Sequence, residues 1–283
     1  MAVERIGVVG LGAMGAGIAQ VAIEAGFEVV GREVTADLGE TAVGRIGHFL
    51  ARKVEKGQRT QDERDAAVAR LVTTTELADL ADCDLVIEAI VEELDAKRAL
   101  FAELERICRG DAVLATNTSA LSVTEIAAAT ATPERVVGMH FFNPAPLMPL
   151  VEVVRAQLSS DEAVAAVLAV VERLGKVAVP CYDTPGFVVN RVLLPLLNDC
   201  VRVLDEARVT PEALDAAMTN GAGWPMGPCT LLDLVGIDVH VHASEALYEK
   251  LREPRMAPPP RIVGMRNAGL LGRKSGRGFY AYG

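Results

Sequence analysis

Short hydrophobic runs rich in β-branched residues alternate with longer amphipathic segments through the first half of the chain. In the longer segments apolar residues recur every three or four positions, as at Leu100, Leu104 and Ile107, which is the spacing of one helix face. Because alternating strands and helices require crossover connections, we predict a parallel sheet with helices on both faces. The strands expected are Arg5–Val9, Glu28–Val30, Leu71–Thr73, Leu85–Glu88, Ala112–Ala115 and Val136–His140.

One further strand–helix–strand unit follows, and then the pattern changes. Leu150–Val154 and Val177–Val179 are predicted strands, with a helix at Asp161–Leu174 between them. From Phe187 onward the pattern is helical, apart from a short strand expected in the last few residues. The helical segments expected are Val188–Ala207, one that begins at Thr210–Pro211, and Leu231–Leu251, followed by a loop at Pro254–Pro260. The sequence therefore predicts a Rossmann-type, mostly parallel α/β domain over residues 1–183 and an all-helical domain over residues 184–283.

Composition narrows the class of protein. The 283 residues are 51% hydrophobic, which suffices for a large core, and no apolar run approaches the ~18 residues of a membrane span. The net charge of -10 argues against a nucleic-acid or membrane partner. The five cysteines are odd in number and form no CxxC pair, so we expect reduced thiols and no metal site. With no signal peptide expected at the start, a cytoplasmic protein is predicted.

A glycine pattern follows the first strand. Gly10, Gly12 and Gly15 form GxGxxG between a strand and a helix, the arrangement that lets a backbone turn approach a pyrophosphate. Glu33 ends the second predicted strand and can accept both ribose hydroxyls of NAD. Arg32 keeps NADP as an alternative, because an arginine there can bind the 2′-phosphate. Glycines needed only for packing are the other interpretation.

His140 ends a predicted strand at the same edge of the sheet. Asn117 and Ser119 follow a neighbouring parallel strand, and ligands of such folds bind at the carboxyl ends of the strands. Glu152 comes after a turn and could return to hydrogen-bond the histidine. A base with an orienting carboxylate forms a proton-transfer pair. The alternative is a histidine whose nitrogens are satisfied by the backbone.

With these residues in place, the chain resembles the L-3-hydroxyacyl-CoA dehydrogenase family along nearly its whole length. The segment that contains His140 and the segment PGFVVNR are together specific to this family, whereas the glycine turn is shared by many folds. The motifs that carry the resemblance are "GLGAMGAGIAQ", "IEAIVEELDAK", "ATNTSALSVTEIA", "GMHFFNPAP", "LVEVV", "DTPGFVVNR", "GWPMGP" and "GLLGRKSGRGFYAY".

The resemblance implies a role for each matching residue. His140 would be the general base, and Glu152 would hold its imidazole in the useful tautomer. Ser119 and Asn190 would hydrogen-bond the substrate oxygen and its surroundings. The cofactor contacts implied by the turn and the resemblance together are Gly10, Gly12, Ala13, Met14, Gly15, Glu33, Glu92, Lys97, Asn117, Ser119, Asn143 and Lys274.

Several of these residues have a purely structural alternative. Asn190 could cap a helix or bridge two helices, and Ser119 could cap the helix that begins near Ser122. Glu92 could favour a helix N-terminus, and Lys274 could be a solvated loop residue.

A basic segment offers a local site for an anionic ligand despite the net charge. Arg45, Arg52, Lys56 and Arg59 are spaced to share one face of a helix. The resemblance places a CoA-contacting helix here, so Lys56 and then Lys53 are the predicted substrate contacts. A solvated helix face is the alternative.

These observations lead to one predicted activity and two alternatives. The resemblance implies reversible oxidation of an (S)-3-hydroxyacyl-CoA to a 3-oxoacyl-CoA with NAD, on short chains such as 3-hydroxybutyryl-CoA, by a homodimer paired through the helical domain. One alternative is a dehydrogenase of a free hydroxy acid or sugar acid. The other is a non-catalytic dinucleotide-binding structural protein.

Overall fold

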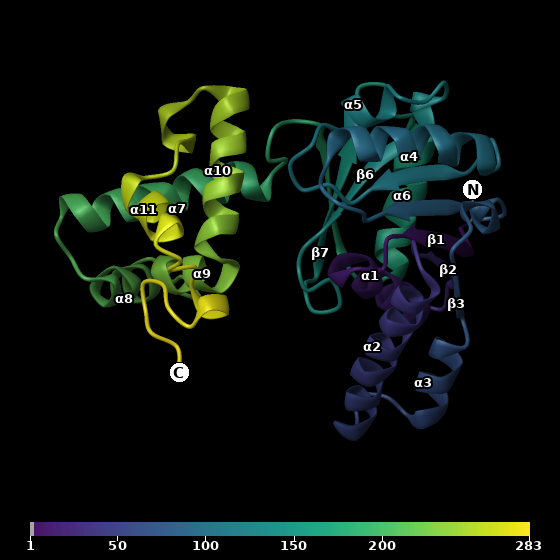
Figure 1. The fold of residues 1–283 in the computed structure, drawn as a ribbon, viewed down its shortest axis with the longest axis horizontal. Helices are drawn as coiled ribbons and strands as arrows, with labels where there is room; N and C mark the ends of the chain where they lie inside the picture. Colours follow the sequence, from purple (N-terminus) through teal and green to yellow (C-terminus); the bar gives the residue numbers. More distant parts are fainter. Residues whose placement is uncertain (1–2) are drawn as a thin grey trace. The chain divides into compact units, whose positions relative to one another are not determined.

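The computed structural model describes residues 3–283, which form two compact units, one ending at Thr184 and the other beginning at Pro185. The first unit holds every strand of the described chain and the second is helical (Figure 1). The fold class predicted from the alternation of strands and helices is confirmed.

The first unit is built on an eight-stranded sheet with the order β3-β2-β1-β4-β5-β6-β7-β8. Every neighbouring pair is parallel except β6 and β7, which are antiparallel. The strands are β1 Arg5–Val9, β2 Glu28–Arg32, β3 Leu71–Thr74, β4 Leu85–Glu88, β5 Val113–Thr116, β6 Val136–Phe141, β7 Leu150–Arg155 and β8 Val177–Tyr182. The predicted strands therefore fall on observed ones, with ends that differ by a few residues.

Helices pack against this sheet through alternating strand positions. Val113 and Ala115 of β5 join one core with residues of α1, α2 and α6, while Leu114 between them is also fully buried. Strand residues that are buried on both sides need helices over both faces. The helices of this unit are α1 Ala13–Glu24, α2 Ala36–Glu55, α3 Gln61–Val68, α4 Leu94–Ile107, α5 Val123–Ala127 and α6 Asp161–Arg173, with 3₁₀ turns at Leu77–Leu80 and Pro133–Arg135.

The second unit differs from expectation in three places. The helix expected at Leu231–Leu251 is broken at Gly236, whose φ of 104° is unfavourable for other residues. The loop expected at Pro254–Pro260 contains a 3₁₀ turn, and Pro260 begins a helix, where its missing N–H costs nothing. The expected C-terminal strand is only a pair of isolated bridges. The helices are α7 Val189–Glu206, α8 Pro211–Gly221, α9 Pro228–Val235, α10 Ile237–Leu251 and α11 Pro260–Asn267, with 3₁₀ turns at Pro254–Met256 and Arg273–Ser275.

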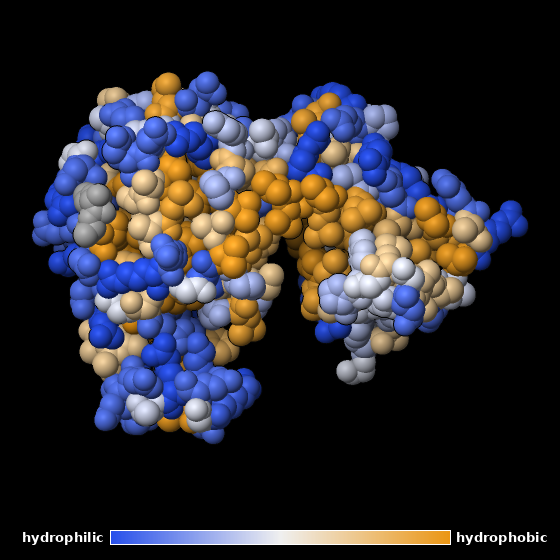
Figure 2. Space-filling model, turned by 180° about the vertical axis from the view of Figure 1, so that it is seen from behind, coloured by the Kyte–Doolittle hydropathy of each residue, from blue (hydrophilic) through white to orange (hydrophobic). Residues whose placement is uncertain are grey.

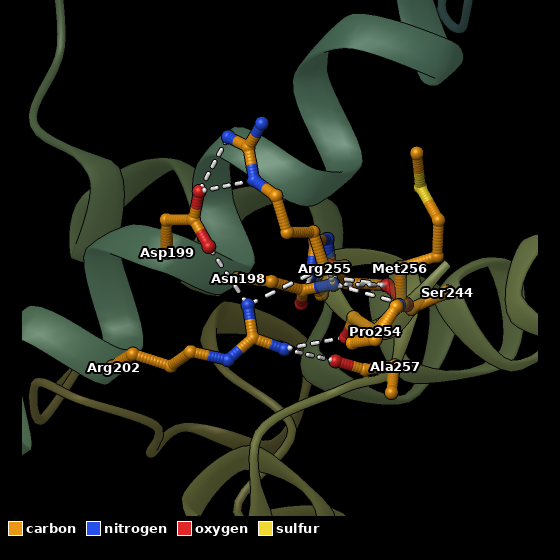
Figure 3. A network of polar contacts seen from close by, with 9 residues as sticks. Asn198, Asp199, Arg202, Ser244, Pro254, Arg255, Met256 and Ala257 are labelled. Carbon is orange, nitrogen blue, oxygen red and sulfur yellow. Dashed lines mark hydrogen bonds and ion pairs between the residues drawn. The ribbon is translucent and has the colours of Figure 1, made fainter. Parts of the chain in front are cut away.

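A buried polar network ties α7 and α10 to the Pro254–Met256 turn (Figure 3). The amide of Asn198 donates to Ser244 Oγ at 3.3 Å and to the Met256 carbonyl at 3.2 Å, and its oxygen contacts His240 Nε2 at 2.9 Å. Burial lowers the pKa of His240 to about 4. His240 is therefore a neutral structural residue, and its sequence neighbour His242 is exposed.

Candidate active site

The carboxyl ends of β1, β2, β4, β5 and β6 lie along one edge of the sheet, because these strands are parallel. The glycine turn follows β1 at this edge. Gly10 has a φ of 87°, and a Cβ on Gly15 would lie 1.7 Å from the Gly10 carbonyl oxygen. A Cβ on Gly12, in contrast, would meet no atom within 4 Å. The first and third glycines are thus required by the fold, whereas the second leaves open space above the turn.

That open space faces a helix end suited to an anion. Gly12 is the N-cap of α1 and no side chain caps the helix there, so its first turn, with Ala13 and Met14, keeps backbone N–H groups for a ligand. Arg45 of α2 donates to the carbonyls of Leu11 at 2.9 Å and Gly12 at 2.8 Å. Arg45 therefore stabilises the glycine turn, and it also lines the cavity beside it.

Glu33 lies beside the same turn, just after β2. Its carboxylate accepts from the N–H of Leu11 at 2.6 Å and from that of Val34 at 2.9 Å. Two backbone donors fix the carboxylate at the position where a dinucleotide fold recognises ribose hydroxyls. Arg32 instead donates its Nε to the Thr75 carbonyl at 3.2 Å. Open space over Gly12, an uncapped helix end and a fixed carboxylate together fit NAD.

His140 and Glu152 lie opposite each other in the antiparallel pair β6–β7. Nδ1 of His140 is 2.7 Å from Oε2 of Glu152, so the contact predicted between them is present. Their exposed fractions are 5% and 0%. The Phe142 ring lies against the imidazole, with centroids 4.6 Å apart. The antiparallel strand therefore fixes both the distance and the orientation of the pair.

Asn117 joins the neighbouring strand end to this pair. Its Oδ1 accepts from the N–H of Phe141 at 2.9 Å, which connects the end of β5 to the residue after His140. Asn143 comes two residues later and begins the turn toward β7. Both asparagines are thus held within a few residues of the imidazole.

Glu92 organises the loop that carries Ser119. Its Oε1 accepts from Thr118 Oγ1 and from the Ser119 N–H, each at 2.7 Å, and lies 3.2 Å from Ser119 Oγ. Burial acts to raise the pKa of Glu92, but the charge of Lys97 and these hydrogen bonds outweigh it and lower the pKa. Ser122, not Ser119, caps α5. Glu92 therefore stays ionised and positions the serine.

Lys97 lies beneath this edge rather than on it. Its side chain is 1% exposed and its ammonium forms an ion pair at 2.5 Å with Glu88, which is completely buried at the end of β4. Glu88 also accepts from the Ile90 N–H and from Thr116 Oγ1, each at 2.7 Å. Lys97 is 3.3 Å from Glu92, so we interpret it as support for Glu92. Glu88 was not predicted as a site residue from the sequence, although an acidic residue at the end of an otherwise apolar strand indicates a buried charge with a partner.

A cavity of about 430 Å³ opens between α1, α2 and the loop after His140. Its lining is mainly apolar, with cations from α2, and includes Gly17, Phe49, Arg52, Lys56, Asn143 and Leu147. Lys53 also lines it, and its ammonium is 2.5 Å from Glu24. The shared helix face predicted for four basic residues is wrong at Arg59, because α2 ends at Glu55 and Gly57 turns the chain with a φ of 67°.

Asn190 and Lys274 belong to the helical unit. Asn190 is half-buried in the first turn of α7 and Lys274 is 2.6 Å from Asp238. Among residues 3–283 no cluster of histidines, cysteines and acids suits a metal ion, and none of their helices is long and apolar enough to cross a membrane.

Comparisons with known proteins cover both units. The family model for the 3-hydroxyacyl-CoA dehydrogenase NAD binding domain matches residues 5–184, and the model for the family's C-terminal domain matches residues 186–282. A 3-hydroxybutyryl-CoA dehydrogenase of Mycobacterium tuberculosis is 47% identical over 99% of each chain, and one of Bradyrhizobium diazoefficiens is 44% identical over 99% of this chain and 96% of its own.

A solved structure gives the same result. The crystal structure of (S)-3-hydroxybutyryl-CoA dehydrogenase from Ralstonia eutropha matches all of both chains with a TM-score of 0.97 at 38% identity. The resemblance and the NAD cofactor expected from the sequence are thereby confirmed. The chain belongs to the 3-hydroxyacyl-CoA dehydrogenase family of NAD-dependent oxidoreductases.

Proposed function

We propose that the protein interconverts (S)-3-hydroxyacyl-CoA and 3-oxoacyl-CoA with NAD and acts on short acyl chains, with 3-hydroxybutyryl-CoA and acetoacetyl-CoA as substrates. The observation that carries the proposal is the buried His140–Glu152 pair at the strand edge that also bears the glycine turn. The names of the relatives above support the short acyl chain.

In this proposal His140 is the general base and acid. A carboxylate can only accept a hydrogen bond, so Glu152 selects the tautomer with hydrogen on Nδ1 and leaves the lone pair on Nε2. Nε2 takes the hydroxyl proton in oxidation and returns it in reduction, while Glu152 stabilises the imidazolium that forms. Bound NAD supplies the hydride chemistry.

The remaining site residues orient the two reactants. Ser119 and Asn190 hydrogen-bond the oxygen on the third carbon of the acyl chain, and Glu92 holds Ser119 for this contact. The cofactor is bound by the glycine turn, by Glu33, and by a wider set that comprises Glu92, Asn117, Asn143 and Lys274, while Lys97 acts from beneath the edge by supporting Glu92.

We also propose a cytoplasmic homodimer that pairs through the helical unit. That unit exposes large apolar side chains, among them Val192, Leu234 and Val239, with exposed fractions of 62%, 47% and 50%. Apolar surface on this unit is visible in Figure 2. Exposed apolar area of this kind favours association.

The proposal predicts how the basic side of the cavity acts. Reversing Arg52 and Lys56 together to glutamate should raise the KM for acetoacetyl-CoA about 10²-fold or more, because each of the two charge-assisted phosphate contacts is worth about 1.5–3 kcal/mol. Steady-state kinetics at saturating NADH measure this. Reversing the exposed Arg98 and Arg106 of α4 is the matched control. An unchanged KM in the Arg52/Lys56 variant would mean that these two residues are solvated and do not contact the substrate.

A second prediction concerns cofactor choice. Glu33→Gln keeps an oxygen for the Leu11 N–H but removes the charge, so the KM for NADH should rise about tenfold. The preference for NADH over NADPH should fall, because a carboxylate repels the 2′-phosphate. Kinetics with both cofactors measure the ratio, and Glu40→Gln, at an exposed position on α2, is the control. An unaltered ratio would remove Glu33 from ribose recognition.

The test of the proposed function is a spectrophotometric assay of NADH and NADPH oxidation. Acetoacetyl-CoA, longer 3-oxoacyl-CoA thioesters and free acetoacetate are compared as substrates. Fastest turnover with NADH and acetoacetyl-CoA is expected. Turnover of the free acid alone would favour the hydroxy-acid alternative, and NAD binding without any turnover would favour the structural one.

A further inference from the structure

Thr118 lies between Asn117 and Ser119 in the loop that follows β5. Both neighbours belong to the proposed site, whereas Thr118 itself is only 1% exposed. A side chain that is so completely buried contacts neither substrate nor cofactor. Any part that Thr118 takes in the reaction must therefore pass through the residues around it.

The hydroxyl of Thr118 has a fixed direction. Its Oγ1 accepts from the Leu121 N–H at 2.9 Å, and a backbone N–H can only donate. The hydroxyl hydrogen therefore goes to its other neighbour, Oε1 of Glu92, which lies 2.7 Å away. Because an ionised carboxylate can only accept, each of these two hydrogen bonds has a single possible direction.

Glu92 also holds the far side of the peptide bond between Thr118 and Ser119. The oxygen that accepts from the Thr118 hydroxyl accepts from the Ser119 N–H at 2.7 Å. The N–H of Thr118 donates to Thr116 Oγ1 at 3.3 Å. Since these contacts leave the backbone little freedom, they set the direction in which the Ser119 side chain leaves the chain.

One lysine serves two carboxylates beneath this loop. The ammonium of Lys97 lies 2.5 Å from Glu88 and 3.3 Å from Glu92. Neutral donors offset the excess negative charge, Thr116 at Glu88 and Thr118 at Glu92. Burial raises the pKa of Glu92, and the charge of Lys97 and then the Thr118 hydrogen bond are the largest opposing effects. Loss of the Thr118 hydroxyl would thus make Glu92 easier to protonate.

We propose that Thr118 is a positioning residue, whose hydroxyl keeps Glu92 ionised and fixes the backbone so that the Ser119 side chain points at the substrate. The inference rests on the proposed function, because the role of Ser119 belongs to that proposal. A serine at position 118 supplies the same hydroxyl, whereas a valine fills nearly the same space without it.

The test compares Thr118→Val with Thr118→Ser in the reduction of acetoacetyl-CoA by NADH across the pH range. Thr118→Val should lower kcat about tenfold, because a hydrogen bond to a charged group is lost. The pH below which kcat declines should rise, because Glu92 protonates more easily. The alkaline side of the profile should stay unchanged, since it reports loss of the proton that His140 must donate. Thr118→Ser should keep kcat within about twofold, because it loses only a methyl group.

Thr130→Val makes the same change at a buried threonine outside this loop. The Thr130 hydroxyl donates to the Ala127 carbonyl at 2.8 Å, just after α5. This variant should keep the kcat and the pH profile of the wild type, whatever its stability in urea unfolding. Unchanged kcat in Thr118→Val, a lowered kcat with an unmoved acid side, or a failure of Thr118→Ser to retain activity would each overturn the inference.

Thr118→Cys takes the place of Thr118→Val if the valine variant does not fold, because a thiol is only a weak donor. A kcat lowered about threefold, with the acid side moved to higher pH, supports the inference, and wild-type values refute it. Absence of turnover in the wild-type protein would instead contradict the proposed function. Fluorescence titration with NADH across the pH range then still decides: binding that weakens at a higher pH in the variant supports the inference, and an unmoved curve refutes it.

Discussion

Replacement of His140 by glutamine should lower the turnover of acetoacetyl-CoA about 10²-fold or more, while the affinity for NADH changes little. General acid–base catalysis contributes about 10²–10⁴ to rates, and glutamine cannot carry a proton between substrate and solvent. The amide keeps a polar group of similar size near Glu152, so a buried carboxylate is not left alone. Single-turnover oxidation of NADH measures the chemical step, and fluorescence titration measures cofactor binding.

A matched substitution separates catalysis from stability. His242→Gln makes the same change at an exposed position of α10 and should retain full turnover. Comparable loss of NADH affinity and turnover in His140→Gln would point to a misfolded strand edge. Normal turnover would remove His140 from the mechanism.

The catalytic pair could be anticipated because its geometry follows from local patterns. His140 ends one β-branched run, Glu152 lies inside the next, and a proline-containing turn joins them. A short turn between consecutive strands favours antiparallel pairing, and pairing places the two side chains in register. The glycine turn and Glu33 were equally accessible, since a tight turn after a strand leaves few choices of residue.

Ion pairs between residues that are distant in the sequence could not be predicted in this way. Lys97 falls on the same face of α4 as the buried Phe101 and Leu104, but its spacing does not reveal that its ammonium pairs with Glu88 beneath the strand edge. Arg59 fits a continued helix by spacing, but Gly57 turns the chain and brings Arg59 to Glu24. Which cation meets which carboxylate depends on how elements pack, and single-sequence periodicity carries no such information.

The helical unit shows the same limit in its backbone. Gly236 interrupts a continuous apolar pattern, and only its positive φ reveals why the helix stops. Pro260 belongs to a proline-rich stretch that suggests a loop, although a proline is well suited to begin a helix. Where a residue permits two backbone conformations, tertiary packing selects one of them.

Lys97→Met is expected to destabilise the first unit by about 3–5 kcal/mol, because it leaves Glu88 buried without its cation. The remaining partners of Glu88 are the Ile90 N–H and the Thr116 hydroxyl, and neither carries a charge. Urea unfolding measured by a probe within this unit reports the change. Arg98→Met, the exposed neighbour on α4, should cost less than about 1 kcal/mol.

The double variant Glu88→Leu with Lys97→Met distinguishes the two roles of the lysine. A buried ion pair replaced on both sides by apolar residues is often neutral for stability, so the double variant should recover most of the loss. The KM for NADH should be raised in Lys97→Met and in the double variant alike, because in both of them Glu92 has lost the cation that lies 3.3 Å away and keeps it ionised beside Ser119. Recovery of both the stability and the KM would mean that Lys97 contributes only to the stability of the core and has no role in cofactor binding. No recovery of stability would mean that the unpaired charge on Glu88 is not the source of the destabilisation.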